Sequence, residues 1–347
     1  MEISLKINEN IPREEWESYV KNHPYGIIYH LPAWKEVLEE SFNYNPFYIF
    51  ARDETGKLCG ILPLFQVKSL ITGNRMVSLP FSYICGPIAD SEFVEKEMLK
   101  EAEKICCERG CKYMEIRDIK PKNIDLEASN YFSTYVVNLS SNVDSVWKRM
   151  DKGSVRWAIN KSKRDDVKVV HENNMENLKI FNKLNQKTKR SLGVPAHPHI
   201  FLKGILQKMQ ENMELYLAEI GGKIIAGVFT LNFKDTILYA YGASDEKYLK
   251  YYPNNLLIWK AIEDGCKNGY KYFDFGRASQ DNIGLIEFKK RWGSEEKKLF
   301  YYYYPKKIKT LSTSREGSKY KIATSVWKKM PVQLSESLSN ILFKHFD

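Results

Sequence analysis

Residues 236–293 decide the fold, and they read TILYAYGASDEKYLKYYPNNLLIWKAIEDGCKNGYKYFDFGRASQDNIGLIEFKKRWG. The β-branched and aromatic run at 237–241 ends at small residues, which predicts a strand. Apolar residues at helical spacing follow Pro253 and predict a helix of about four turns. The aromatic run at 270–275 predicts a second strand. Its carboxyl end is the edge where α/β proteins usually bind ligands.

The first half of the chain has the same order of elements as the second. GCKYMEIRD at 110–118 matches GYKYFDFGR at 269–277 in the pattern of its residues. Both halves read as strand, turn, two further strands, helix and strand, which indicates an internal duplication. Each copy is therefore predicted to be a mixed, mainly antiparallel sheet flanked by helices, so that the fold class is α/β with two similar domains.

We predict a first domain over 1–142, a second over 143–304 that contains the active site, and a basic helical segment over 305–347. The second domain opens with a predicted lysine- and arginine-rich helix at 143–163. The amphipathic helix near the C-terminus is expected to pack on the first domain. Contact with a membrane surface is the alternative.

The composition limits the class of protein. The chain has 347 residues and a net charge of +10, which favours an anionic partner such as a phosphorylated substrate, a nucleic acid or a membrane surface. Its apolar runs are shorter than the roughly 20 residues of a membrane span, and its charged first ten residues do not resemble a signal peptide. The six cysteines lack paired CxxC motifs, so we expect reduced thiols, no metal site and a cytoplasmic protein.

The element order resembles the Gcn5-related N-acetyltransferase (GNAT) superfamily, and the motifs of the second half resemble its FemABX-like branch of peptidoglycan bridge-forming aminoacyltransferases. The motifs are YGAS at 241–244, PNNLL at 253–257, FDFG at 273–276, and the run from Gly284 through Phe288-Lys289 to Gly293. The segment that begins at Arg156 is similar to the arginine-rich start of that family's second domain. Together these motifs are specific for the superfamily and much less so for a substrate.

This resemblance implies that aminoacyl-tRNA donates an amino acid to the amine of a lipid-linked or nucleotide-linked muropeptide, without a metal or a bound cofactor. Amine attack on an ester forms a tetrahedral oxyanion, which a positioned lysine can stabilise. Lys289, in the family's Phe-Lys motif, is the predicted catalytic residue, and Lys290 would support a donor or substrate phosphate. A surface ion pair is the alternative for Lys289.

The remaining candidates are predicted to bind substrate. Tyr241 and Ser244 would donate hydrogen bonds, and Asn254 would place the N-terminus of a helix against an anion, unless it only caps that helix. Asp274 and Arg277 would orient the acceptor amine and its phosphate or carboxylate, with a mutual ion pair as the alternative. Arg156 belongs to a basic face that would contact phosphate or RNA backbone, or that is simply solvated.

Two other functions fit the sequence. Residues 190–195 resemble relatives linked to exopolysaccharide or surface sugars, which favours an acyl-CoA-dependent N-acyltransferase for an amino sugar. However, KYYPNN at 250–255 lacks the glycines of an acetyl-CoA pyrophosphate loop. Leu38 also stands where Fem-like enzymes carry a substrate-binding lysine, which Lys35 would have to replace. The second alternative is a non-catalytic module that binds nucleic acid or membrane. Walker, GxSxG, HExxH and Rossmann motifs are absent from the sequence.

Overall fold

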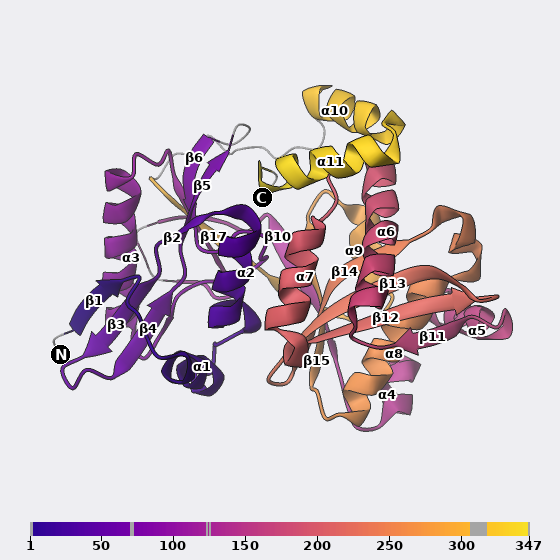
Figure 1. Ribbon diagram of the computed structural model, residues 1–347. Coiled ribbons are helices and arrows are strands. Elements are labelled where there is room, and N and C mark those ends of the chain that lie inside the picture. The colour runs from indigo at the N-terminus through magenta and orange to yellow at the C-terminus, as the bar shows by residue number, and fades with distance from the viewer. Residues whose placement is uncertain (1–2, 70–72, 123, 125, 306–317, 346–347) are drawn as a thin grey trace. The chain divides into compact units, whose positions relative to one another are not determined.

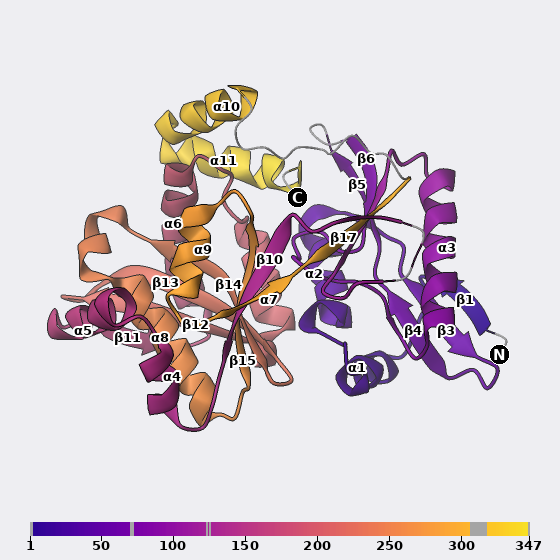
Figure 2. The same cartoon turned by 180° about the vertical axis from the view of Figure 1, so that it is seen from behind.

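The computed structural model describes residues 3–69, 73–122, 124, 126–305 and 318–345. The chain divides into two compact units (Figures 1 and 2). The first unit comprises residues 1–133, 298–312 and 344–347, and the second comprises 134–297 and 313–343.

The first unit contains two sheets. Strands β1 (Ile3–Ile7), β3 (Ile49–Asp53), β4 (Leu58–Leu62) and β7 (Ile88–Ala89) form a four-stranded sheet in that order. The order of the six-stranded sheet is β2 (Asn45–Pro46), β5 (Phe65–Ser69), β6 (Gly73–Val77), β8 (Met114–Asp118), β17 (Phe300–Tyr304) and β9 (Glu127–Ser129). Its helices are α1 (Arg13–Asn22), η1 (Ile28–His30), α2 (Pro32–Phe42) and α3 (Glu92–Glu108).

The second unit is built on one seven-stranded sheet. The strand order is β11 (Lys168–His171), β12 (Met213–Ile220), β13 (Lys223–Phe233), β14 (Thr236–Ser244), β15 (Tyr272–Ser279), β10 (Phe132–Asn138) and β16 (Glu295–Lys298). Pairing is antiparallel from β11 to β14 and parallel between β14 and β15. These mixed sheets, flanked by helices, confirm the predicted fold class.

Helices cover both faces of this sheet (Figure 1). On one face are α4 (Val143–Arg149), the π-helix η2 (Lys152–Arg156), α5 (Trp157–Arg164) and α8 (Pro253–Lys267), whose apolar residues share one core with the sheet. On the other are α6 (Met175–Leu192) and α7 (His199–Lys208). The shorter elements are η3 (Gln210–Asn212), η4 (Glu246–Tyr251) and α9 (Ile283–Lys290).

Strands β14 and β15 pair over only their first three residues. The paired positions run from Thr236 with Tyr272 to Leu238 with Asp274, whereas the strands continue to Ser244 and Ser279. The carboxyl halves of two neighbouring parallel strands are therefore not bonded to each other. Backbone groups in these halves need other partners, because unpaired buried peptide groups are costly. This divergence positions the candidate site.

Two segments differ from their predicted structure. The helix expected over 143–163 is divided, because Met150 adopts extended backbone after α4 and a π-helical turn precedes α5. The C-terminal segment is predicted to pack on the first domain. Its described helices α10 (Ser318–Lys329) and α11 (Val332–Leu342) contact α6 of the second unit, whereas the carbonyls of Lys344 and His345 accept hydrogen bonds from the Tyr44 and Ser69 hydroxyls of the first unit. Within the second unit, the backbone N–H of Ala196 donates to the Ser339 hydroxyl, 3.0 Å away. Turn η5 (Phe343–His345) follows α11.

Candidate active site

Lys289 lies at the end of α9 with its side chain directed into the protein. It is 3% exposed, and its Nζ donates to the carbonyl oxygens of Gly276 at 2.7 Å and Arg277 at 2.9 Å. Both carbonyls belong to the half of β15 that has separated from β14. The Lys289 ammonium thus donates to backbone oxygens in a buried setting, which does not fit the surface ion pair considered as the alternative.

The environment of Lys289 lowers its pKa, but the side chain remains an ammonium at neutral pH. Burial lowers the pKa of Lys289 to about 8, the charge of Asp274 acts to raise it, and the charge of Arg277 lowers it further. An ammonium has three N–H donors, and the two carbonyls take two of them. The Tyr135 ring lies 5.6 Å from the same Nζ. A positioned ammonium with a third N–H donor is suited to stabilising a developing negative charge.

Asp274 shapes the strand beside that lysine. Its side chain is 5% exposed, and its Oδ1 accepts hydrogen bonds from the Thr134 hydroxyl and from the backbone N–H of Gly276, the latter at 2.8 Å. Gly276 has a φ of 68°, a conformation that suits glycine. Asp274 therefore holds the backbone that presents a carbonyl to Lys289. Its predicted contact with an acceptor amine stays a prediction, as does that of Arg277, which is exposed.

Ser244 and Asn254 meet where β14 ends and α8 begins. The Asn254 amide donates to the Ser244 hydroxyl at 3.3 Å. The hydroxyl of Thr188 in α6 accepts from the Ser244 backbone N–H at 2.8 Å and donates to the Ser244 carbonyl at 2.9 Å. Asn254 is not the N-cap of α8, because that position is Tyr252, whose side chain makes no capping bond. The first N–H groups of α8 therefore lack a side-chain cap, and anions bind readily at such helix ends.

Two buried polar atoms that have no described hydrogen-bond partner lie in the same part of the second unit. The Asn254 Oδ1 and the Arg156 Nε are buried, and neither has a hydrogen-bond partner among the described residues. Trp157, next to Arg156, packs edge-on against Tyr252 with ring centroids 5.2 Å apart. The start of α5 therefore lies beside the start of α8. Lys290 is elsewhere and pairs with Glu296 at 3.6 Å.

Tyr241 points to the opposite face of the sheet from Tyr239. β14 carries an extra residue, because Phe229 pairs with Tyr241 and the next residue of β13 pairs with Tyr239. The Tyr241 ring packs on His197 at 4.3 Å, against α7. The Tyr239 ring packs near Phe275 at 6.1 Å, beside the separated strands. The sequence identified Tyr241 and overlooked Tyr239, whose place depends on the extra residue.

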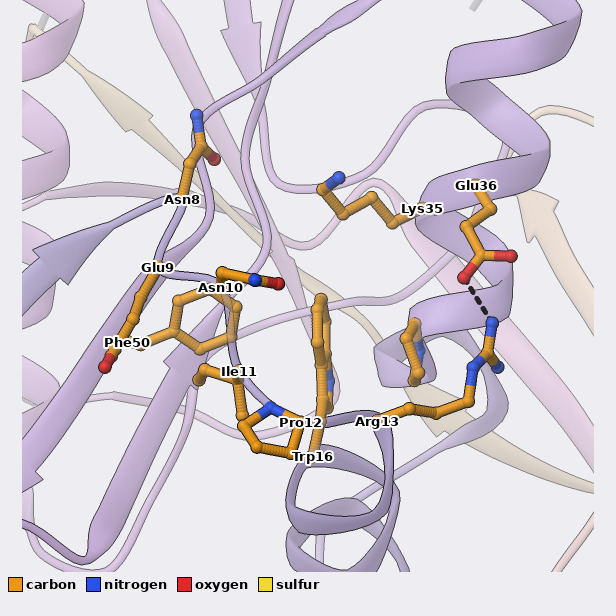
Figure 3. A pocket seen from close by; sticks show the side chains of 11 residues that line it. Asn8, Glu9, Asn10, Ile11, Pro12, Arg13, Trp16, Lys35, Glu36 and Phe50 are labelled. Atoms are coloured by element: carbon orange, nitrogen blue, oxygen red, sulfur yellow. Dashed lines mark hydrogen bonds and ion pairs between the residues drawn. The ribbon is translucent and has the colours of Figure 1, made fainter.

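The first unit contains a separate cavity of about 450 Å³ between the starts of α1 and α2 (Figure 3). The Trp16 ring stands between Phe50 and Arg13, and Arg13 is ion-paired with Glu36. Lys35 also lines the cavity and pairs with Glu39 at 2.7 Å. An aromatic ring with amide and charged groups around it suits a polar ligand that has an apolar face.

The described residues contain no group of three or more His, Cys, Asp or Glu side chains arranged to hold a metal ion. Within the same residues, no helix is both long enough and apolar enough to cross a membrane.

Gly293 closes the motif that contains Lys289, and we expect Gly293→Ala to lower the free energy of unfolding by about 2 kcal/mol. Its φ is 72°, and an added Cβ would lie 3.0 Å from the backbone oxygen of Arg149. Urea denaturation measures the change. Gly284→Ala is the matched control, because a Cβ there meets nothing within 4 Å and alanine favours its helix. Equal stabilities of the two variants would contradict this prediction.

The comparisons with known proteins agree with this geometry. Residues 151–290 match the family model for the acetyltransferase (GNAT) domain. The crystal structure of FemX superposes with a TM-score of 0.67 at 16% identity, covering 87% of this chain and 97% of that one. The C-terminal domain of a putative lysylphosphatidylglycerol synthetase from Agrobacterium fabrum gives 0.58 at 12% identity, covering 84% and 90%.

A tandem GNAT protein from the clavulanic acid biosynthesis pathway gives a TM-score of 0.51 at 9% identity, covering 87% of this chain and 98% of that one. No curated protein sequence matches the chain significantly. At these identities the solved structures show the fold, and the family model adds the class of domain. Residues 151–290 therefore match the GNAT acetyltransferase domain, and the chain has the fold of FemX that its sequence motifs predict.

Proposed function

We propose that the protein is an aminoacyltransferase that forms an amide bond on a cell-envelope precursor, with aminoacyl-tRNA as the donor and a muropeptide amine as the acceptor. The observation that carries this proposal is Lys289, a buried lysine held by two carbonyls where β14 and β15 diverge. Support also comes from the FemX fold and from a structural neighbour whose name gives a lysyl lipid as its product.

The proposed reaction needs one positioned cation. The neutral acceptor amine attacks the carbonyl carbon of the aminoacyl ester, and the tetrahedral intermediate carries a negative oxygen. When it collapses, the C–N bond remains, the ester C–O bond breaks, and the proton lost by the amine is taken up by the ribose oxygen. The third N–H of Lys289 stabilises the oxyanion, where charge develops only during the reaction.

An exposed basic and aromatic surface supports a nucleic-acid donor. Trp157 is 45% exposed and packs against Tyr252, so its ring is available for a base to stack on. Exposed lysine and arginine side chains lie near these two residues in the sequence. They are Lys152, Lys163 and Arg164 on either side of Trp157, and Lys247 and Lys250 before Tyr252. We name this set of residues the Trp157 surface. Stacking aromatics beside lysines are typical of proteins that bind single-stranded nucleic acid, such as the 3′ end of a tRNA.

A second candidate function is acyl-CoA-dependent N-acylation of an amino sugar. It is favoured by the match of residues 151–290 to the acetyltransferase domain and by the uncapped N-terminus of α8, which would accept a pyrophosphate. The aromatic and amide lining of the cavity at Trp16 would suit a sugar ring. The two candidates differ in the donor, and the donor can be tested directly.

The deciding experiment offers the purified protein charged tRNA pools and a panel of acyl-CoA thioesters in parallel. Thermal stabilisation reports binding by mass action, and donor deacylation with an envelope-precursor amine reports transfer. We expect a response to aminoacyl-tRNA. A response to acyl-CoA alone would replace the proposed function with sugar N-acylation. Transfer from neither donor to any precursor amine would contradict both candidates.

The Trp157 surface gives a further prediction. Trp157→Ala is expected to weaken tRNA binding roughly tenfold, because stacking of one base contributes about 1–3 kcal/mol. Titration at fixed salt with charged and uncharged tRNA measures this. Phe93→Ala is the control, since Phe93 is 49% exposed and lies in the first unit. Equal losses in both variants would show that the ring at Trp157 has no specific role.

A further inference from the structure

The C-terminus of α3 brings two cysteines together. The N–H of Gly110 donates to the carbonyl of Cys107, and the N–H of Cys111 donates to the carbonyl of Cys106, both at 3.0 Å. Gly110 has a φ of 58°. This pair of bonds around a left-handed glycine is the Schellman motif, in which the side chains at the positions of Cys106 and Cys111 contact each other. Cys111 accordingly packs against the core that contains Cys106.

Asn74 of β6 fixes this turn. Its side-chain amide donates to the carbonyls of Arg109 at 3.0 Å and Gly110 at 2.9 Å, and its backbone carbonyl accepts from the N–H of Lys112 at 2.8 Å. The Cys111 thiol lies 3.6 Å from the Asn74 Oδ1. The two cysteines are thus held in one conformation next to each other, and a disulfide requires the Cα atoms of its cysteines to lie within about 7 Å.

The two thiols differ in a way that suits sequential chemistry. Cys106 is 1% exposed, whereas Cys111 is partly exposed. A hydrogen bond from Cys106 lowers the pKa of Cys111, burial opposes this, and the charges of Lys68 and Arg109 lower it further. A thiolate is the nucleophile in disulfide exchange, so the accessible member is also the more reactive one.

We propose that Cys106 and Cys111 are a redox-active pair that forms an intramolecular disulfide on reaction with a low-molecular-weight disulfide such as oxidised glutathione. The Cys111 thiolate attacks one sulfur of the small disulfide, forms a mixed disulfide and releases one thiolate. Cys106 then attacks the Cys111 sulfur, its proton passes to the second leaving thiolate, and the protein disulfide forms. Two protein thiols are oxidised and one small disulfide is reduced to two thiols.

The bridge would link the last turn of α3 to the segment that enters β8 in the first unit. Neither cysteine is among the residues assigned to transfer chemistry, so this proposal is independent of the proposed function. Cys107 provides the matched comparison. It is adjacent in sequence and exposed, but its thiol lies 3.5 Å from the Tyr304 hydroxyl and outside the paired positions of the motif.

The experiment incubates the full chain with excess oxidised glutathione and counts free thiols after denaturation. We expect the count to fall from six to four with no glutathione retained, and peptide mapping under non-reducing conditions to join Cys106 to Cys111. Cys107→Ser should form the same bridge. Cys111→Ser should lose the bridge while remaining folded, since its side chain is partly exposed.

Three results would overturn the proposal. One is retention of glutathione on Cys111 of the wild-type chain without a second bond. Another is a bridge that maps to Cys107. The third is loss of the bridge in Cys107→Ser. Mapping of the wild-type chain needs no variant, so the proposal remains testable even if Cys106→Ser fails to fold.

Discussion

Replacing Lys289 by alanine is expected to lower turnover by about 10²–10³-fold while changing the apparent affinity for the donor much less. The reason is that its third N–H is proposed to bind an oxygen that becomes negative only in the transition state, so its loss removes transition-state stabilisation rather than ground-state binding. Steady-state kinetics of amide formation with the donor identified by the competition experiment measures both quantities.

Lys290→Ala is the control for that variant. Lys290 is the next residue of α9, is about half exposed, and pairs with Glu296 rather than with the strand carbonyls. We expect its turnover to stay within a few-fold of wild type. Circular dichroism and urea denaturation must show that Lys289→Ala is folded. A variant that binds donor poorly but turns over normally at saturation would assign Lys289 to binding instead.

The part of the site that follows sequence periodicity could be predicted. The β-branched run of β14, the Pro253 start of α8 and the aromatic run of β15 are local patterns, and each element formed where its pattern lies. Lys289 was identified from its place in a family motif. That it is buried and bonded to Gly276 and Arg277 follows from where α9 packs, which no local pattern encodes.

Other features depend on contacts between distant segments. The hydroxyl of Thr134 meets Asp274 across 140 positions, and the hydroxyl of Thr188 meets Ser244 across 56. Neither threonine stands out in the sequence. The extra residue Ala240 in β14 changes which face Tyr241 occupies, and the glycine of that strand, Gly242, lies two residues beyond the shift and does not mark it. The register of β14 and the pairing of side chains that are distant in the sequence therefore could not be predicted from sequence patterns.

The pH dependence of turnover provides the second large expected effect. Burial lowers the pKa of Lys289 to about 8. If the ammonium stabilises the oxyanion, activity is retained below this pKa and falls about tenfold per pH unit above it, because the neutral amine has lost the charge. Lys289→Arg is expected to move the falling limb to higher pH, since arginine stays protonated. A profile that rises through pH 8 in the wild type but not in Lys289→Arg would instead identify Lys289 as a general base, because deprotonation of the acceptor amine would affect both proteins alike.

The same pKa has a consequence for stability, which tests it without any substrate. Lys289 titrates near 10.5 when unfolded and about 8 when folded, so the unfolded chain binds more protons between these values. The free energy of unfolding contributed by this group therefore rises with pH from about 8 to 10.5, and below 8 the buried charge costs up to about 3 kcal/mol. Lys289→Met has no proton to bind, so the difference in stability between wild type and this variant should increase in favour of wild type across that window. A difference that stays constant from pH 7.5 to 10.5, measured by urea denaturation, would mean that the Lys289 pKa is not lowered, and the descending limb of the activity profile would then have to come from another group.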